Sequence, residues 1–98
     1  MAIVTCIAFP SAPLGKEKEV GERFLALATA TRAEPGCIDF IVHRNVKIGN
    51  RYAAFEQFKD HDAFVEHGKL AHTKEFITKL DSIGGILQYE FWDRIDGR

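Results

Sequence analysis

The sequence predicts a single α+β domain of the ferredoxin-like type, in which four antiparallel strands form one sheet and helices cover one of its faces. Three observations predict this fold class. The chain has 98 residues, which is enough for one hydrophobic core and short for two domains. Its apolar residues recur with strand and helix periods in the order βαββαβ. No repeat, linker or low-complexity tract divides residues 1–98.

The first half of the chain supplies a strand, a helix and a second strand. Residues 2–9 are rich in β-branched and apolar side chains at both odd and even positions, which is typical of a central strand covered on both faces. Residues 16–33 carry one apolar stripe at helical spacing. Pro35 ends this helix because it cannot continue the hydrogen-bond ladder. Residues 37–44, "CIDFIVHR", alternate well enough to predict a strand.

The second half completes the sheet. A hairpin loop leads into residues 51–58, the returning strand. Asp60 is the expected N-cap of a short helix that breaks at Gly68. A second short helix is expected over residues 73–82, and a pair of glycines separates it from the last strand, residues 86–94.

The strands carry large apolar side chains on both faces, although helices can cover only one. Phe40 and Ile41 point to opposite faces of the second strand, as do Tyr89 and Trp92 in the last strand. A contiguous apolar sheet face rarely stays exposed to water. We therefore expect a homodimer formed through the open face of the sheet.

Composition argues against several classes of protein. The formal net charge is −1 and the charges are scattered, whereas nucleic-acid-binding proteins usually show a basic excess. "RYAAFEQF", residues 51–58, half-matches the RNA-recognition strand pattern but lacks its glycine and one base-stacking aromatic. The first apolar run is too short to span a membrane. Cys6 and Cys37 fall on strands that should not be neighbours. We expect a cytoplasmic protein with reduced thiols that binds neither nucleic acid nor membrane.

A group of inward-facing residues predicts a small-molecule pocket. Strand parity turns Glu56 toward the helices, where a carboxylate is costly unless it is paired. His67 lies on the same helix face as Phe64, and His72 follows across a break in the helix. An apolar cavity with a few converging polar groups is the usual composition of a ligand site. The aromatic residues expected to form its walls are Tyr52, Phe58 and Phe64.

Plainer interpretations stand beside this one. Glu56 could form only an ion pair with Arg44 or Arg51, and a lone histidine on an apolar helix face is more often a core residue than a catalyst. A metal is not expected, because His67 and His72 would lie about 140° apart around a continuous helix. Ligand pairs on one helix favour spacings of three or four residues.

Several stretches of the chain resemble the antibiotic biosynthesis monooxygenase superfamily. They are "AEPGCIDFIVHR", "NRYAAFEQFKDHDAFVEHGKLAHTKEF" and the final "YEFWD", which together cover nearly the whole chain. The resemblance implies a dimeric α+β barrel, in which two sheets pack face to face and each subunit has a pocket between sheet and helices. It also implies an enzyme that oxidises a quinol or hydroxylated aromatic with dioxygen and needs no metal or flavin.

The resemblance implies roles for three polar residues. His67 matches the histidine of the family's first short helix and is the expected general base. Glu56 is the expected acid that orients it, and His72 is expected to add a polar contact at the mouth of the pocket.

Other branches of the superfamily suggest alternative functions. A branch that isomerises a phosphorylated diketone, the autoinducer-2 signal, is similar around His67 and His72. It has a further histidine in its first helix, where this chain has small residues near Ala28. The heme-degrading branch needs a ligating histidine where this chain has Ile77. A non-catalytic binding protein is the remaining alternative.

Overall fold

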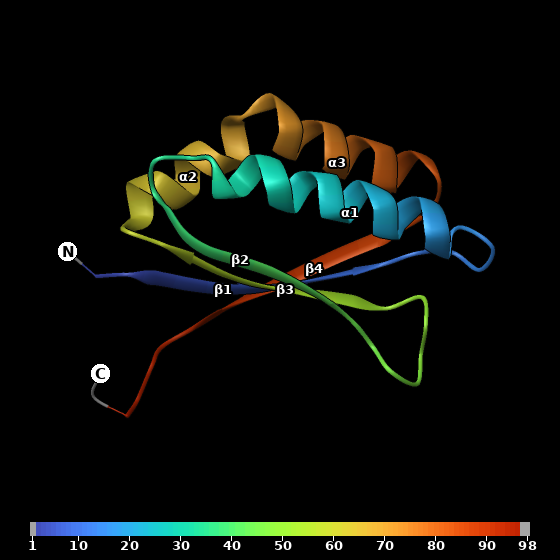
Figure 1. The fold of residues 1–98 in the computed structure, drawn as a ribbon, viewed down its shortest axis with the longest axis horizontal. Coiled ribbons are helices and arrows are strands. Elements are labelled where there is room, and N and C mark those ends of the chain that lie inside the picture. The colour runs from blue at the N-terminus through green and yellow to red at the C-terminus, as the bar shows by residue number, and fades with distance from the viewer. Residues whose placement is uncertain (1, 97–98) are drawn as a thin grey trace.

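Four antiparallel strands and three helices make up the described part of the computed structural model, residues 2–96 (Figure 1). The strands are β1 (Val4–Ser11), β2 (Cys37–Arg44), β3 (Tyr52–Phe58) and β4 (Ile86–Trp92). The helices are α1 (Glu17–Arg32), α2 (His61–Lys69) and α3 (Ala71–Ser82). This confirms the ferredoxin-like α+β fold and its βαββαβ order, with the second helical segment in two pieces.

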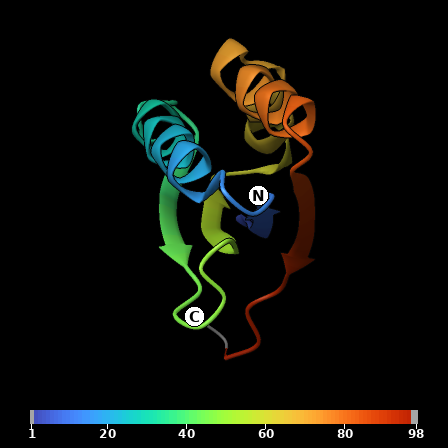
Figure 2. The ribbon, with the colours of Figure 1, turned by 90° about the vertical axis from the view of Figure 1, so that its right-hand side faces the viewer.

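The strands lie in the order β2-β3-β1-β4, and all three helices cover the same face of the sheet (Figure 2). The α1 helix lies over the β2 side, and α3 lies over the β4 side. Because β3 separates β1 from β2, Cys6 and Cys37 do not meet, and both thiols are free. No helix among residues 2–96 combines the length and apolar character needed to cross a membrane.

The core lies between this sheet and the helices. Val20, Phe24 and Ala28 form the buried stripe of α1. The Phe24 ring stacks on Phe76 of α3, with 5.4 Å between ring centroids, and meets Phe40 of β2 edge-on. The apolar stripe predicted over residues 16–33 is therefore the buried face of α1.

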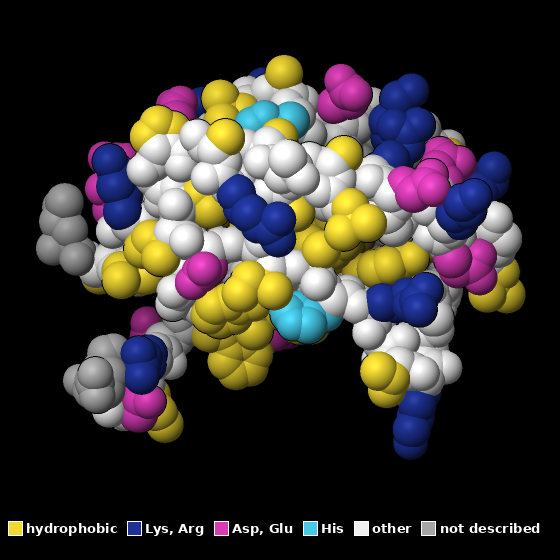
Figure 3. Space-filling model, viewed as in Figure 1, with side chains coloured by type: hydrophobic (Ala, Val, Ile, Leu, Met, Phe, Trp, Pro, Cys, Tyr) yellow, Lys and Arg dark blue, Asp and Glu magenta, His cyan; other side chains and the backbone are white. Residues whose placement is uncertain are grey.

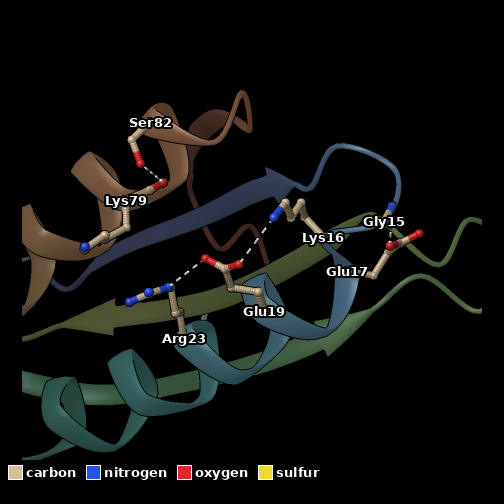
Figure 4. Close-up of polar contacts among 7 residues, drawn as sticks. All are labelled: Gly15, Lys16, Glu17, Glu19, Arg23, Lys79 and Ser82. Carbon is tan, nitrogen blue, oxygen red and sulfur yellow. Dashed lines mark hydrogen bonds and ion pairs between the residues drawn. The ribbon is translucent and has the colours of Figure 1, made fainter.

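Charged side chains on the exposed face of α1 make a hydrogen bond and two ion pairs around its first turn (Figure 4). Glu17 Oε1 accepts a 2.7 Å hydrogen bond from the backbone N–H of Gly15. Glu19 lies between Lys16 and Arg23, with nitrogen–oxygen distances of 4.0 and 3.4 Å. Negative side chains in the first turn interact favourably with the positive end of the helix dipole.

The break between α2 and α3 differs from the prediction. The Asp60 side chain caps α2 by accepting from the Ala63 N–H at 2.8 Å, as expected. However, α2 continues through Gly68 to Lys69, and the break falls at Leu70, whose backbone is extended at φ −74° and ψ 150°. A single glycine inside a helix is tolerated at modest cost, so Gly68 alone did not end it.

The other face of the sheet has no helix above it. Ile41, Phe55 and Ile7 lie opposite one another across β2, β3 and β1. Trp92 on β4 faces the same way and is 53% exposed. Figure 3 shows hydrophobic side chains gathered on the side of the molecule away from the helices. The apolar open face predicted from strand parity is therefore present in the isolated chain.

Candidate functional site

A cavity of about 180 Å³ lies between the sheet and the helices. Its walls are mostly apolar and come from all seven elements. The lining residues are Cys6, Phe24, Leu27, Phe40, Glu56, Phe64, His67, Gly68, Thr73, Phe76, Ile77, Leu87 and Tyr89. Gly68, Ile77 and Tyr89 are also exposed to solvent, so they mark the mouth. The cavity thus opens between the α2–α3 break and β4.

His67 reaches this cavity from α2 and is buried, with 6% of its surface exposed. Aromatic rings fix its orientation. The Phe58 ring is 5.0 Å away, centroid to centroid, the Phe40 ring 6.0 Å and the Phe64 ring 6.4 Å. A polar ring in such surroundings needs a hydrogen-bond partner to offset its lost hydration.

The hydrogen-bond partner of His67 is Glu34. It lies in the turn after α1, and its Oε2 is 2.8 Å from His67 Nδ1. The same oxygen is 2.6 Å from Nε2 of His72, which lies in the first turn of α3. The prediction that Glu56 orients His67 is therefore wrong. The carboxylate at His67 comes from the loop before β2, because the α1–β2 turn passes beside the start of α2.

The hydrogen bonds set the tautomer of His67. A carboxylate can only accept, so His67 Nδ1–H and His72 Nε2–H both donate to Glu34. The Thr73 hydroxyl oxygen is also 3.3 Å from His67 Nδ1. With its proton on Nδ1, neutral His67 has a lone pair on Nε2, and this nitrogen has no protein partner within residues 2–96. A histidine held in this way can accept a proton from a bound molecule.

Glu56 occupies another part of the cavity wall. It projects inward from β3, is 5% exposed, and makes no hydrogen bond or ion pair to any described residue. Burial, and secondarily the negative charge of Glu34, raises the pKa of Glu56 from 4.5 to about 8. Its carboxyl group therefore holds a proton at neutral pH and can donate it in a hydrogen bond. Burial also raises the pKa of the neighbouring Cys6 thiol to about 12, so Cys6 is not a thiolate at neutral pH.

The predicted wall residues have three different positions. Phe64 lines the cavity. Phe58 is fully buried behind the His67 ring and supports it. Tyr52 lies elsewhere, in a more open groove of about 600 Å³ beside the first half of α1, where its hydroxyl donates to the Glu17 carbonyl at 2.7 Å. Tyr52 is thus not part of the cavity that contains His67.

His72 is the most accessible polar member of the group, with 30% of its side chain exposed. It does not line the cavity. His72 is linked to His67 through their shared hydrogen-bond acceptor Glu34, and the residue after His72, Thr73, does line the cavity. The spacing argument against a metal applies only to one continuous helix. Because His67 and His72 lie on two helices that meet at Leu70, their rings approach to 6.3 Å between centroids.

Two site residues were missed from the sequence, and only one left a signal there. Glu34 directly precedes Pro35 and Gly36, which end the first helix. The sequence therefore showed a carboxylate at a well-defined position in the chain, the end of that helix. Thr73 follows His72 and left no such signal. Its position against His67 depends on the angle between α2 and α3.

Comparison with solved structures shows the same fold in other proteins. PA3566 from Pseudomonas aeruginosa has a TM-score of 0.89 and 22% identity, with 97% of this chain and 96% of that chain covered. Rv0793 from Mycobacterium tuberculosis has a TM-score of 0.87 and 20% identity, covering 97% of each chain. A candidate antibiotic biosynthesis monooxygenase from Deinococcus radiodurans has a TM-score of 0.88 and 19% identity, covering 97% of this chain and 95% of that chain.

A search of the curated proteins finds no match. The family model described as antibiotic biosynthesis monooxygenase matches residues 3–79, well over half of the chain. This match agrees with the sheet order, the helix arrangement and the fold of the solved structures. The chain belongs to the antibiotic biosynthesis monooxygenase family.

Proposed function

We propose that the protein is a cofactor-independent monooxygenase that oxidises a hydroxylated aromatic or quinol with a single ring. One observation carries the proposal. His67 has its Nδ1 proton held by Glu34, and its other nitrogen is left without a protein partner in a cavity walled by aromatic rings. This arrangement suits removal of a phenolic proton in a site that excludes water.

His67 is the general base in this mechanism, and Glu34 positions it. Proton transfer from the substrate hydroxyl to His67 Nε2 produces a phenolate and an imidazolium. Glu34 stabilises the imidazolium, because its Oε2 already accepts the Nδ1–H at 2.8 Å. The Thr73 hydroxyl oxygen, 3.3 Å from the same nitrogen, can accept a second and longer hydrogen bond from its N–H.

The phenolate supplies the electrons that dioxygen needs. It transfers one electron to O₂, and the resulting radical and superoxide combine to form a carbon–oxygen bond at a ring carbon. Loss of that carbon's proton and cleavage of the O–O bond then leave a new carbonyl and release water. A quinol and O₂ thus give a hydroxyquinone and H₂O, with all four electrons drawn from the substrate.

Glu56 has a separate role as a hydrogen-bond donor. Its pKa of about 8 keeps it protonated at neutral pH, and no described residue accepts its proton. A neutral carboxylic acid in an apolar site can stabilise negative charge on a substrate oxygen without adding charge of its own. His67 and Glu56 then act on the substrate as base and donor, and both lie on the wall of one cavity.

The dimensions and charge of the cavity limit the substrate class. Its volume of about 180 Å³ suits one aromatic ring, since an engineered cavity of about 150 Å³ binds benzene. No lysine or arginine is among its lining residues. A phosphorylated diketone would need a cation for its phosphate group, so the lining favours a phenol over the isomerase substrate.

We also propose that the working form is a homodimer through the open face of the sheet. The row of Ile41, Phe55 and Ile7 is apolar, and Trp92 extends it on β4. An obligate interface of this kind buries on the order of 2,000 Å² in total. Such a dimer would remove both apolar faces from water at once.

Substitution of Phe55 by Asp should dissociate or unfold the dimer, because it places a charge in the middle of this face. Light scattering at micromolar concentration would measure the mass of the wild type and the variant. Leu14→Asp is the control, since Leu14 is 84% exposed in the β1–α1 connection. A wild-type protein that stays monomeric and soluble would contradict the dimer.

The proposed activity is tested by incubating the purified, chelator-treated protein with single-ring quinols and phenols under air. Dioxygen should be consumed with no added flavin or metal. Absence of consumption across the panel, by protein shown to be folded, would instead support a binding role for the cavity.

A further inference from the structure

Three side chains bring ligand atoms for a metal ion together beside the cavity. The ligand atoms of Glu34, His67 and His72 all lie within 4.8 Å of one another. Glu34 Oε2 is 2.8 Å from His67 Nδ1 and 2.6 Å from His72 Nε2. We propose that these three residues form a binding site for one divalent transition-metal ion of the zinc type.

The donor atoms match this class of ion. Imidazole nitrogens and a carboxylate oxygen bind Zn²⁺ at about 2.0–2.2 Å, and a tetrahedral shell then spaces the ligand atoms about 3.3 Å apart. The spacings of 2.6 and 2.8 Å are shorter because protons join these atoms. Conversion of the hydrogen-bonded group into a ligand set requires loss of these protons and a small adjustment of all three side chains, whose ligand atoms already lie within 4.8 Å of one another. Three protein ligands leave a fourth position for water.

The placement of the ligands also suits a metal ion. Glu34 follows α1, His67 belongs to α2 and His72 to α3, so an ion would connect three helices at one point. The Glu34 and His67 side chains are 8% and 7% exposed, which limits competition by bulk water. His72 is more exposed and lines a hollow on the surface between α1 and α3, which gives the ion a route of entry.

Metal binding would change the tautomer of His67. A neutral imidazole that coordinates through Nδ1 must carry its proton on Nε2. The cavity-facing nitrogen then becomes a hydrogen-bond donor and can no longer accept a proton. Zinc would therefore inhibit turnover. This consequence rests on the proposed function, whereas the binding itself does not.

The experiment is a calorimetric titration of the full chain, treated with chelator, with zinc chloride. One ion should bind per chain. His72→Asn should weaken binding by more than the roughly 10- to 100-fold that loss of an outer-shell partner costs, because it removes a ligand. His61→Asn is the matched control, since His61 is an exposed histidine on α2. Cobalt(II) gives a second readout, as its visible spectrum reports tetrahedral coordination.

Three outcomes would overturn the proposal. They are a folded wild-type protein that binds no zinc, a His72→Asn variant that binds as tightly, and loss of binding in His61→Asn. Thermal unfolding of each variant without metal establishes that it is folded. Zinc binding by a protein that oxidises no quinol would leave the metal site standing and reject only the proposed function.

Discussion

Substitution of His67 by Gln is expected to reduce turnover by roughly 10²- to 10⁴-fold, the usual contribution of a positioned general base. Glutamine keeps a hydrogen-bonding group of similar bulk beside Glu34 and Phe58, so the pocket should retain its shape. It has no nitrogen lone pair that can take a phenolic proton. Substrate binding should change much less, because the apolar walls supply most of the affinity. Steady-state kinetics and a direct binding measurement separate the two effects.

His61→Gln serves as the control for this substitution, because His61 lies on the same helix with its side chain in solvent. Its turnover should match that of the wild type. Thermal unfolding must accompany the kinetics, since loss of buried contacts around His67 can destabilise the core. Unchanged turnover in a folded His67→Gln protein would remove His67 as the base.

Substitution of Glu56 by Gln is expected to stabilise the protein, and more so as the pH rises. The pKa of Glu56 is 4.5 when exposed and about 8 in the folded protein. Below pH 4.5 both states carry the proton, and the folded state has its full stability. Between about pH 4.5 and 8 only the folded state keeps it, so the free energy of unfolding falls by at most about 1.4 kcal/mol per pH unit.

Above about pH 8 the folded state also loses the proton, and the loss of stability levels off at a ceiling of about 5 kcal/mol. Glutamine does not titrate, so the variant lacks this slope. Urea unfolding at several pH values and one fixed protein concentration gives the difference. Glu22→Gln, at an exposed position on α1, should show no such trend. A stability difference between Glu56→Gln and wild type that is independent of pH would show that Glu56 is not a buried neutral acid.

Most of the fold could be predicted because the turn residues and the periodicity of apolar side chains indicate the same elements in the same order. The β2 strand occupies the predicted residues because the Pro35–Gly36 turn before it fixes its start. The open apolar face followed from the two-residue period of the strands. The α2–α3 break was misplaced because the sequence signal, Gly68, is weaker than the packing that turns the chain at Leu70.

The site could be predicted only in part. Strand parity identified Glu56 as an inward-facing residue, and helical spacing placed His67 beside Phe64. The partner of His67 could not be found this way, because Glu34 is 33 residues away in sequence and meets it only through tertiary packing. Tyr52 has the same parity as Glu56 but lies in a different hollow of the same face. Parity determines the face of a sheet, not the position along it.

The most direct test of the account is the fate of the two oxygen atoms when the protein oxidises a single-ring quinol under isotopically labelled dioxygen. The mechanism at His67 and Glu56 predicts one labelled oxygen in the hydroxyquinone and one in water, for each molecule of O₂ consumed. Mass spectrometry of the product measures the first, and an oxygen electrode gives the stoichiometry. Product oxygen derived from unlabelled water, or release of hydrogen peroxide in equal amount to the product, would contradict oxygen insertion and with it the proposed monooxygenase.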